Sequence, residues 1–185
     1  MTPPKLPSSL IIVGSGAIGM EFASFYNDLG VDVTIVEALP SILPNEDTDI
    51  SKIVKLSFEK RGIKIKTSSA LKSVTTNENS VSAEIITNEK VETINSEKLV
   101  LAIGIIANTE KLVLKEFNVK IDKGHIVTNE FLETDEKGVY AIGDITDGPW
   151  LAHKASHEGI LCVEKIAGHK NLKPIDKTSI PGCTY

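Results

Sequence analysis

Cysteine is scarce in this 185-residue sequence, which contains only Cys162 and Cys183. Two cysteines cannot build a disulfide framework, and their separation fits neither a Cys-x-x-Cys redox motif nor a zinc site. We therefore expect ordinary thiols in a reducing compartment. No apolar run approaches the roughly 20 residues that a membrane span needs. The first residues also lack the apolar core of a signal peptide, so we expect no association with a membrane.

Positive charge is scarce as well. The 20 Lys and Arg residues are outnumbered by 25 Asp and Glu residues, which leaves a net charge of −5. A net acidic chain without a basic stripe repels phosphate backbones, so we expect no nucleic-acid partner. Apolar residues make up 41% of the sequence and charged residues 24%. That balance is typical of a folded globular protein and not of a disordered one.

The first hundred residues alternate between short apolar runs and helical periods, which predicts parallel strands connected by helices. The predicted strands are Ser9–Val13, Asp32–Glu37, Ile63–Lys66 and Leu99–Ile103, and the first and last of these are expected to be buried. Two helices are predicted to end at Gly30 and Gly62, as glycine commonly follows the last helical turn. Their core-facing stripes are expected at Ile18, Phe22, Phe25, Tyr26 and Leu29, and at Ile50, Ile53, Val54 and Phe58.

Later segments follow different patterns. From residue 70 to residue 96, short alternating stretches rich in Thr, Ser, Asn and Glu predict an antiparallel meander that is solvated on one face. Asp122–Gly124 predicts a turn between two short strands, Val119–Ile121 and His125–Val127. Val139–Ile142 is typical of another buried strand, and Leu151–Ala167 of a helix.

The strongest local signal is the glycine motif Gly14-Ser15-Gly16-Ala17-Ile18-Gly19, which lies between the first predicted strand and the first predicted helix. Gly14 permits a tight turn, Gly16 lets the backbone approach a pyrophosphate, and Gly19 lets the helix pack close to the strand. The helix N-terminus offers its amides and the positive end of its dipole to phosphates. The motif predicts a dinucleotide site on a Rossmann-type doubly wound parallel sheet, in an α/β fold with an antiparallel β-meander.

An acidic residue, Glu37, ends the second predicted strand, 18 residues after Gly19. A carboxylate at that place accepts hydrogen bonds from both hydroxyls of an adenosine ribose and repels a 2′-phosphate. Glu37 therefore favours NAD over NADP. The alternative interpretation is a glycine-rich turn beside a solvated glutamate.

With these residues, Glu21, Leu101–Gly104 and Val139–Asp144 make the sequence resemble the flavin-dependent pyridine nucleotide–disulfide oxidoreductases. Gly148–Ala155 followed by Glu158-Gly159 is similar to the dihydrolipoyl dehydrogenase branch of that family. The resemblance runs over nearly the whole chain but covers only the middle of a family member. The first glycine motif of the FAD site, the redox cysteine pair and the His–Glu acid–base pair of the family are missing, so we assign no catalytic residue.

The resemblance implies roles for single residues in binding NAD and FAD. The NAD pyrophosphate would be held by Gly14, Ser15, Gly16, Ala17, Ile18, Gly19, Met20 and Glu21, with Glu21 reaching toward the nicotinamide. Glu37 would bind the adenine ribose, Leu71 would line the adenine side, and Gly104 would border the NAD cleft. Asp144 would hold the ribityl chain of FAD, although the residues alone also allow a helix or turn cap. Trp150, Leu151, Ala152 and His153 would run beneath the flavin ring.

The resemblance also implies a domain order and an activity. Residues 1–117 would form an NAD-binding domain, residues 118–175 the C-terminal part of a FAD-binding domain, and residues 176–185 the start of a missing interface domain. The parent would oxidise dihydrolipoamide and pass electrons through a disulfide and FAD to NAD. Its partners would be the lipoyl domains of a 2-oxoacid dehydrogenase complex and a second subunit of a homodimer. The expected location is the bacterial cytoplasm, with the mitochondrial matrix as the alternative.

By itself, the 185-residue chain is expected to bind NAD weakly, to hold FAD poorly and to show no turnover. The residues also allow two other hypotheses about the function. The chain could belong to another reductase of the same superfamily, of the mercuric, glutathione or NADH type, although Glu37 argues against the NADPH enzymes. It could also be a non-catalytic nucleotide-binding module. His153 and His157 have the spacing of helical metal ligands but lack the glutamate of the zinc-protease motif, so we expect no metal.

Overall fold

The computed structural model describes residues 3–110, 112 and 116–184. The chain divides into two compact units, Met1–Gly104 and Ile105–Cys183. The domain boundaries expected from the sequence, after residues 117 and 175, concern which cofactor each part binds and stay predictions. Among the described residues, no helix is both long enough and apolar enough to cross a membrane.

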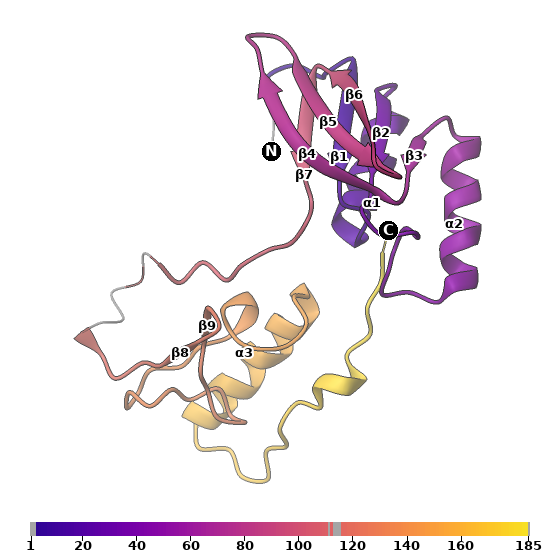
Figure 1. The fold of residues 1–185 in the computed structure, drawn as a ribbon. Coiled ribbons are helices and arrows are strands. Elements are labelled where there is room, and N and C mark those ends of the chain that lie inside the picture. The colour runs from indigo at the N-terminus through magenta and orange to yellow at the C-terminus, as the bar shows by residue number, and fades with distance from the viewer. Residues whose placement is uncertain (1–2, 111, 113–115, 185) are drawn as a thin grey trace. The chain divides into compact units, whose positions relative to one another are not determined.

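The first unit is built on a four-stranded parallel sheet (Figure 1). The strand order is β3-β2-β1-β7, so the chain moves outward on one side of β1 and returns to its other side with β7. This confirms the parallel sheet predicted from the apolar runs. The strands are β1 (Ser9–Val13), β2 (Asp32–Val36), β3 (Lys64–Lys66) and β7 (Lys98–Leu101). The strand predicted at Leu99–Ile103 is present as β7, but its prediction as a buried strand is wrong, because β7 is only partly buried and Leu101 is 56% exposed.

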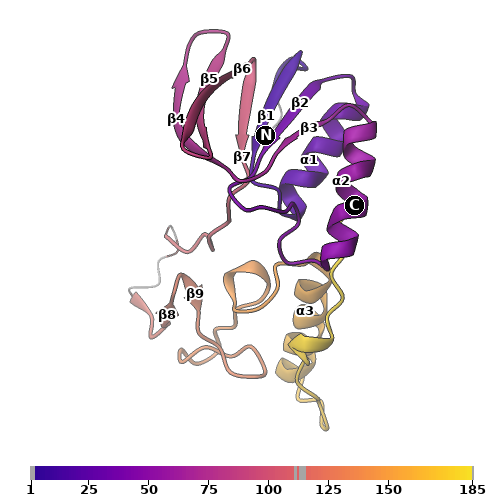
Figure 2. The same ribbon diagram turned by 45° about the vertical axis from the view of Figure 1, so that its right-hand side comes forward.

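Alternate side chains of β1 enter two different cores. Leu10 and Ile12 pack with the helices α1 (Ala17–Asp28) and α2 (Thr48–Lys60) on one face of the sheet. Ile11 and Val13 pack on the other face, against the meander. A strand covered on both faces must be apolar at every position, which explains the continuous apolar run in the sequence. Figure 2 shows the parallel sheet between the helices and the meander.

The meander is the predicted antiparallel one, with the strands β4 (Ser69–Thr76), β5 (Val81–Thr87) and β6 (Lys90–Ser96) in sequence order. Its central strand alternates, because Val81, Ala83 and Ile85 are buried while the residues between them are partly exposed. This alternation agrees with the meander predicted from the Thr- and Ser-rich composition, which is solvated on one face.

The buried faces of both helices differ from the predicted stripes. In α1 the predicted Tyr26 is buried and the predicted Phe22 packs against the core, but Met20 and Ala23 also face inward and Phe25 is 58% exposed. Ile18 and Leu29 are exposed too. The small residues Gly19 and Ala23 lie on the buried side of α1, and at Gly19 there is no space for a Cβ beside the Gly14 carbonyl oxygen.

In α2 the predicted stripe is wrong at two of its four positions. Ile50 and Ile53 are exposed, Val54 is partly buried and Phe58 is buried. Ser51 is turned inward, where its hydroxyl donates to the Leu43 carbonyl at 3.3 Å. A hydrogen-bonded serine can therefore occupy the inner face of a helix that a count of apolar residues assigns to isoleucine.

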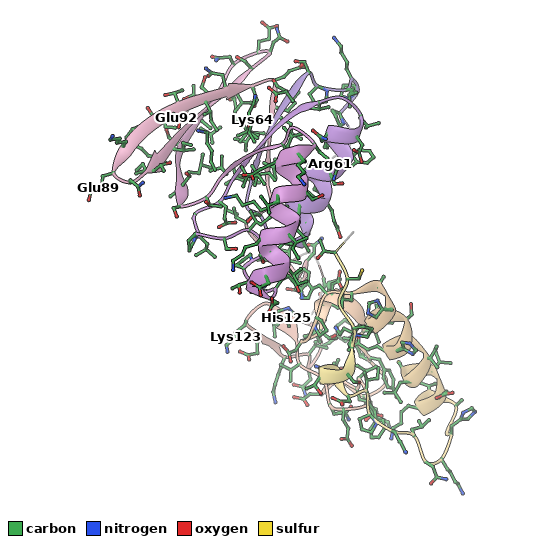
Figure 3. All side chains as sticks on the ribbon, turned by 90° about the vertical axis from the view of Figure 1, so that its right-hand side faces the viewer. Arg61, Lys64, Glu89, Glu92, Lys123 and His125 are labelled. Atoms are coloured by element: carbon green, nitrogen blue, oxygen red, sulfur yellow. The ribbon has the colours of Figure 1, made fainter. Side chains whose placement is uncertain are left out.

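The end of α2 is fixed to α1 by Arg61, which is labelled in Figure 3. Its guanidinium donates to Asp28 Oδ1 at 2.7 Å and to Ser24 Oγ at 3.0 Å. The same group lies over the ring of Phe58, 5.1 Å from its centroid. These contacts join the two helices that cover one face of the sheet.

The second unit contains short strands and one long helix. The strands β8 (Ile121–Asp122) and β9 (His125–Ile126) form the predicted hairpin, and α3 (Ala152–Ile166) is the predicted helix. This unit also contains the short 3₁₀ turns η2 (Gly143–Ile145) and η3 (Lys177–Ser179).

The strand predicted at Val139–Ile142 is wrong. Among the described residues, Tyr140 alone of this segment pairs with another strand-like residue, in an isolated bridge to Glu133. Ala141 is buried, as its apolar character predicts. An apolar run indicates burial, but a strand also needs a neighbour that supplies a ladder of hydrogen bonds, which this segment does not find here.

Candidate functional site

The loop between β1 and α1 turns sharply at Gly14. This residue has φ of +100°, a conformation that side chains rarely adopt. Its amide donates to the Val36 carbonyl at 2.8 Å. A Cβ at this position would lie less than 3.0 Å from the carbonyl oxygen of Ala102. Only glycine therefore fits where the ends of β1, β2 and β7 meet.

The other two glycines of the motif have opposite surroundings. A Cβ on Gly19 would overlap the carbonyl oxygen of Gly14, because the first turn of α1 packs directly on the end of β1. A Cβ on Gly16 would meet nothing within 4 Å. Backbone atoms thus enclose Gly14 and Gly19, whereas Gly16 faces open space. A phosphate that is bound by backbone amides requires this geometry.

The N-terminus of α1 presents amides at this opening. Gly16 is the N-cap residue, and among the described residues no side chain caps this end of the helix. The first amides of a helix have no acceptor within the helix, so those of Ala17, Ile18 and Gly19 can donate to an anion. Met20 differs, because its side chain is buried in the core and its amide already donates to the Gly16 carbonyl at 3.0 Å.

Glu37 lies one residue beyond β2 and is only 8% exposed, so it is not the solvated glutamate of the alternative interpretation. Its Oε2 accepts from the backbone amide of Ser15 at 2.8 Å and from the Ser15 hydroxyl at 2.7 Å. Its Oε1 accepts from the Leu39 amide at 2.8 Å. The carboxylate is thereby held against the glycine motif, with Ser15 fully buried beneath it.

The remaining residues predicted for this site are distributed around it. Glu21 is partly buried in the second turn of α1, and Gly104 is exposed, three residues after the end of β7. Leu71 of β4 packs against the core between the parallel sheet and the meander. Their predicted roles toward NAD stay predictions.

The residues predicted to contact FAD all lie in the second unit. Asp144 is exposed in η2, and Ala152 and His153 are exposed in the first turn of α3. His153 Nε2 lies 2.8 Å from the Pro181 carbonyl oxygen. The ring of Trp150 meets that of His125 edge-on, with centroids 5.8 Å apart. Leu151 occupies the N-cap position of α3, where its apolar side chain has no oxygen that could accept from the first amides of the helix.

A buried ion pair within α3, facing η2, was not predicted from the sequence. Lys154 and Glu158, one turn apart in α3, are 1% and 2% exposed. Lys154 Nζ lies 3.3 Å from Glu158 Oε1 and donates to the Gly143 carbonyl at 3.0 Å. Glu158 Oε2 accepts from the Gly143 amide at 2.6 Å, and Thr146 Oγ1 donates to the Gly143 carbonyl at 2.8 Å.

The pair fixes the turn that carries Asp144. Side chains of α3 bond both polar backbone groups of Gly143, so the turn cannot shift without depriving the Lys154–Glu158 pair of these buried hydrogen bonds. The sequence signal was the Lys–Glu spacing of four on a helix face that also holds Leu161 and Cys162. Such a pair is usually a solvated one, and only burial distinguishes the two cases.

The thiol and imidazole groups of this unit differ in their exposure. Cys162 is buried, and burial together with the charge of Glu133 raises the pKa of its thiol. His153 and His157 are exposed. Within the described part of the chain, no three His, Cys, Asp or Glu side chains gather where they could hold a metal ion.

Comparison with known proteins agrees with this geometry. Residues 1–159 match the family model described as pyridine nucleotide-disulphide oxidoreductase. A dihydrolipoyl dehydrogenase from Rhizobium etli is 48% identical over 186 aligned residues, which cover 100% of this chain and 39% of that protein.

Two solved structures are similar to the whole chain in fold. LpdA from Mycobacterium tuberculosis has a TM-score of 0.86 at 29% identity, covering 99% of this chain and 39% of that one. The HOCl-induced flavoprotein disulfide reductase RclA from Escherichia coli has a TM-score of 0.82 at 25% identity, covering 96% and 39%. The chain thus spans about two fifths of the length of these relatives. It belongs to the pyridine nucleotide-disulphide oxidoreductase family.

Proposed function

We propose that the chain supplies the NAD-binding part of a flavin-dependent dihydrolipoyl dehydrogenase, and that the unit Ile105–Cys183 supplies part of its FAD site. The single observation that carries the proposal is the glycine motif, which is open at Gly16 and flanked by the buried Glu37 carboxylate. The family match and the high identity to a dihydrolipoyl dehydrogenase support it.

The first unit fits an adenine dinucleotide in two ways. The amides at the start of α1 would donate to the pyrophosphate, which can approach because Gly16 has open space in place of a side chain. Glu37 would accept from the ribose hydroxyls, and its negative charge would repel a 2′-phosphate. Together these two contacts would orient the adenosine half of the dinucleotide.

The second unit fits the polyol and ring of a flavin less completely. Asp144 is an exposed carboxylate that can accept hydrogen bonds from ribityl hydroxyls, on a turn held rigid by Lys154 and Glu158. The N-terminus of α3 has no acidic residue in its first turn, so its positive end can stabilise an electron-rich ring.

In the whole protein, the bound cofactors would supply the redox chemistry, which is the transfer of two electrons from a dithiol to NAD. The residues of this chain would bind and orient the cofactors. For the parent we propose homodimers that serve the lipoyl domains of a 2-oxoacid dehydrogenase complex in the bacterial cytoplasm. The structural likeness to RclA favours a second candidate, a flavoprotein disulfide reductase with another substrate, which would use the same NAD site.

Calorimetric titration of the 185-residue chain with NAD and NADP tests the proposal. We expect NAD to bind at least about tenfold more tightly than NADP, because Glu37 repels the additional phosphate. Glu37→Arg is expected to weaken NAD binding and to reverse this preference, since an arginine accommodates a 2′-phosphate. Glu37→Gln removes the charge but keeps an oxygen acceptor, so it should abolish the preference without reversing it.

Glu89→Arg is a matched control, because it makes the same charge change at an exposed position between β5 and β6, labelled in Figure 3. It should leave both affinities unchanged. Equal affinities of the unmodified chain for NAD and NADP, or no binding of NAD at millimolar concentration, would contradict the proposed function.

A further inference from the structure

The Glu37 carboxylate is already heavily bonded within the protein. Three donors reach it, namely the Ser15 amide, the Ser15 hydroxyl and the Leu39 amide. Both Ser15 donors go to Oε2 and the Leu39 donor goes to Oε1. Because Glu37 and Ser15 are buried, the protein itself provides the hydrogen bonds that water would otherwise make.

This arrangement leaves too little acceptor capacity for a ribose. An ionised carboxylate offers about four lone-pair positions, two on each oxygen. Oε2 is full and Oε1 has a single position left. The adenosine ribose of NAD would donate from two neighbouring hydroxyls, so one of the three internal donors must leave before both can bind.

The Ser15 hydroxyl is the donor that can leave most easily. The two amides belong to the backbone, and the loop that carries them is fixed by further bonds: the Gly14 amide donates to Val36, and the Leu43 amide donates to the Ser15 carbonyl at 2.9 Å. The hydroxyl needs only a rotation about one side-chain bond. Its loss from the carboxylate still leaves Glu37 held by two amides.

We propose, on the basis of the proposed function, that the Ser15 hydroxyl is an internal competitor for the ribose and determines how strongly the site discriminates in favour of an intact adenosine diol. In the free protein it occupies the acceptor position that the second ribose hydroxyl needs. NAD must displace it from a fully buried place, which lowers the affinity. A ligand with one ribose hydroxyl can use the remaining position on Oε1 and leaves Ser15 in place.

Calorimetry with NAD and with its 2′-deoxyadenosine analogue tests this competition. Ser15→Ala should tighten the binding of NAD about tenfold, the size expected from one charge-assisted hydrogen bond that no longer has to be broken. The affinity for the 2′-deoxy analogue should stay the same, because that ligand does not displace the hydroxyl. A change in loop structure alone would shift both ligands together.

Two further variants keep the result interpretable. Ser15→Gly removes the same hydroxyl and should reproduce the result of Ser15→Ala, even if one of the two folds poorly. Ser73→Ala deletes a serine–carboxylate bond in the meander, that of Ser73 Oγ to Glu84 Oε2 at 2.9 Å, and should change neither affinity.

The outcomes separate this inference from the function on which it rests. NAD binding that is unchanged or weaker in both Ser15 variants, or equal tightening of both ligands, overturns the competition but leaves the NAD site intact. A failure of the unmodified chain to bind NAD overturns both.

Discussion

Gly19→Ala is expected to lower the free energy of unfolding by about 3 kcal/mol, the upper range for forcing additional volume into a packed interior. The added Cβ would overlap the carbonyl oxygen of Gly14, and that backbone atom cannot rotate away as a side chain can. Either α1 must move off β1 or the turn at Gly14 must open. Thermal unfolding followed by circular dichroism should show a midpoint lower by about 12–24 °C for a unit of this size.

Gly16→Ala is the matched comparison, because the same methyl group at this position meets nothing within 4 Å. Its effect on the free energy of unfolding should stay within about 1 kcal/mol, the cost of alanine at an N-cap. NAD binding should nevertheless weaken, since the methyl group occupies the space that a pyrophosphate needs. Equal stability of the two variants, or NAD binding by Gly16→Ala at the level of the unmodified chain, would contradict this division of roles.

Lys154→Met is expected to destabilise the second unit by about 3–5 kcal/mol, the cost of leaving the partner of a buried ion pair without its counter-charge. Glu158 would stay buried beside the Gly143 peptide, while the Gly143 carbonyl would lose a donor. Urea unfolding monitored by the fluorescence of Trp150, which lies in this unit, measures the change directly.

Two comparisons isolate burial as the cause. Replacing both partners, with Lys154→Met and Glu158→Leu, should destabilise less than the single change does, because no unpaired charge is left. Lys55→Met breaks a Lys–Glu pair of the same helical spacing, with Glu59 in α2, where the side chains are 36% and 42% exposed. That change should cost at most about 0.5 kcal/mol. A similar cost for Lys55→Met and Lys154→Met would contradict the account.

The parts of the fold that could be predicted from sequence are those set by local chemistry. The glycine motif allows few other conformations, since Gly14 needs a positive φ and Gly19 needs the space of a missing Cβ. The strands buried on both faces are continuous apolar runs, and the half-solvated meander alternates. The glycine motif and each single strand span fewer than ten neighbouring residues, so their conformations can be predicted without knowing their distant partners.

The features that were missed depend on distant partners. Whether Ile53 or Ser51 faces the core depends on the loop residue Leu43, to which Ser51 is bonded. Val139–Ile142 is apolar enough for a strand but pairs through a single bridge. The bond between Ser15 and Glu37 joins residues 22 positions apart, and its effect on acceptor capacity follows only from the positions of all three donors.

The central claim, that the glycine motif and Glu37 together bind NAD, is tested most directly by nuclear magnetic resonance of the ¹⁵N-labelled chain during titration with NAD. The account predicts the largest amide shifts at Gly16–Gly19, around the Gly16 opening. Large shifts are also expected at Ser15 and Leu39, because their amides donate to Glu37. Shifts confined to other residues, or an unchanged spectrum at millimolar NAD, would contradict it.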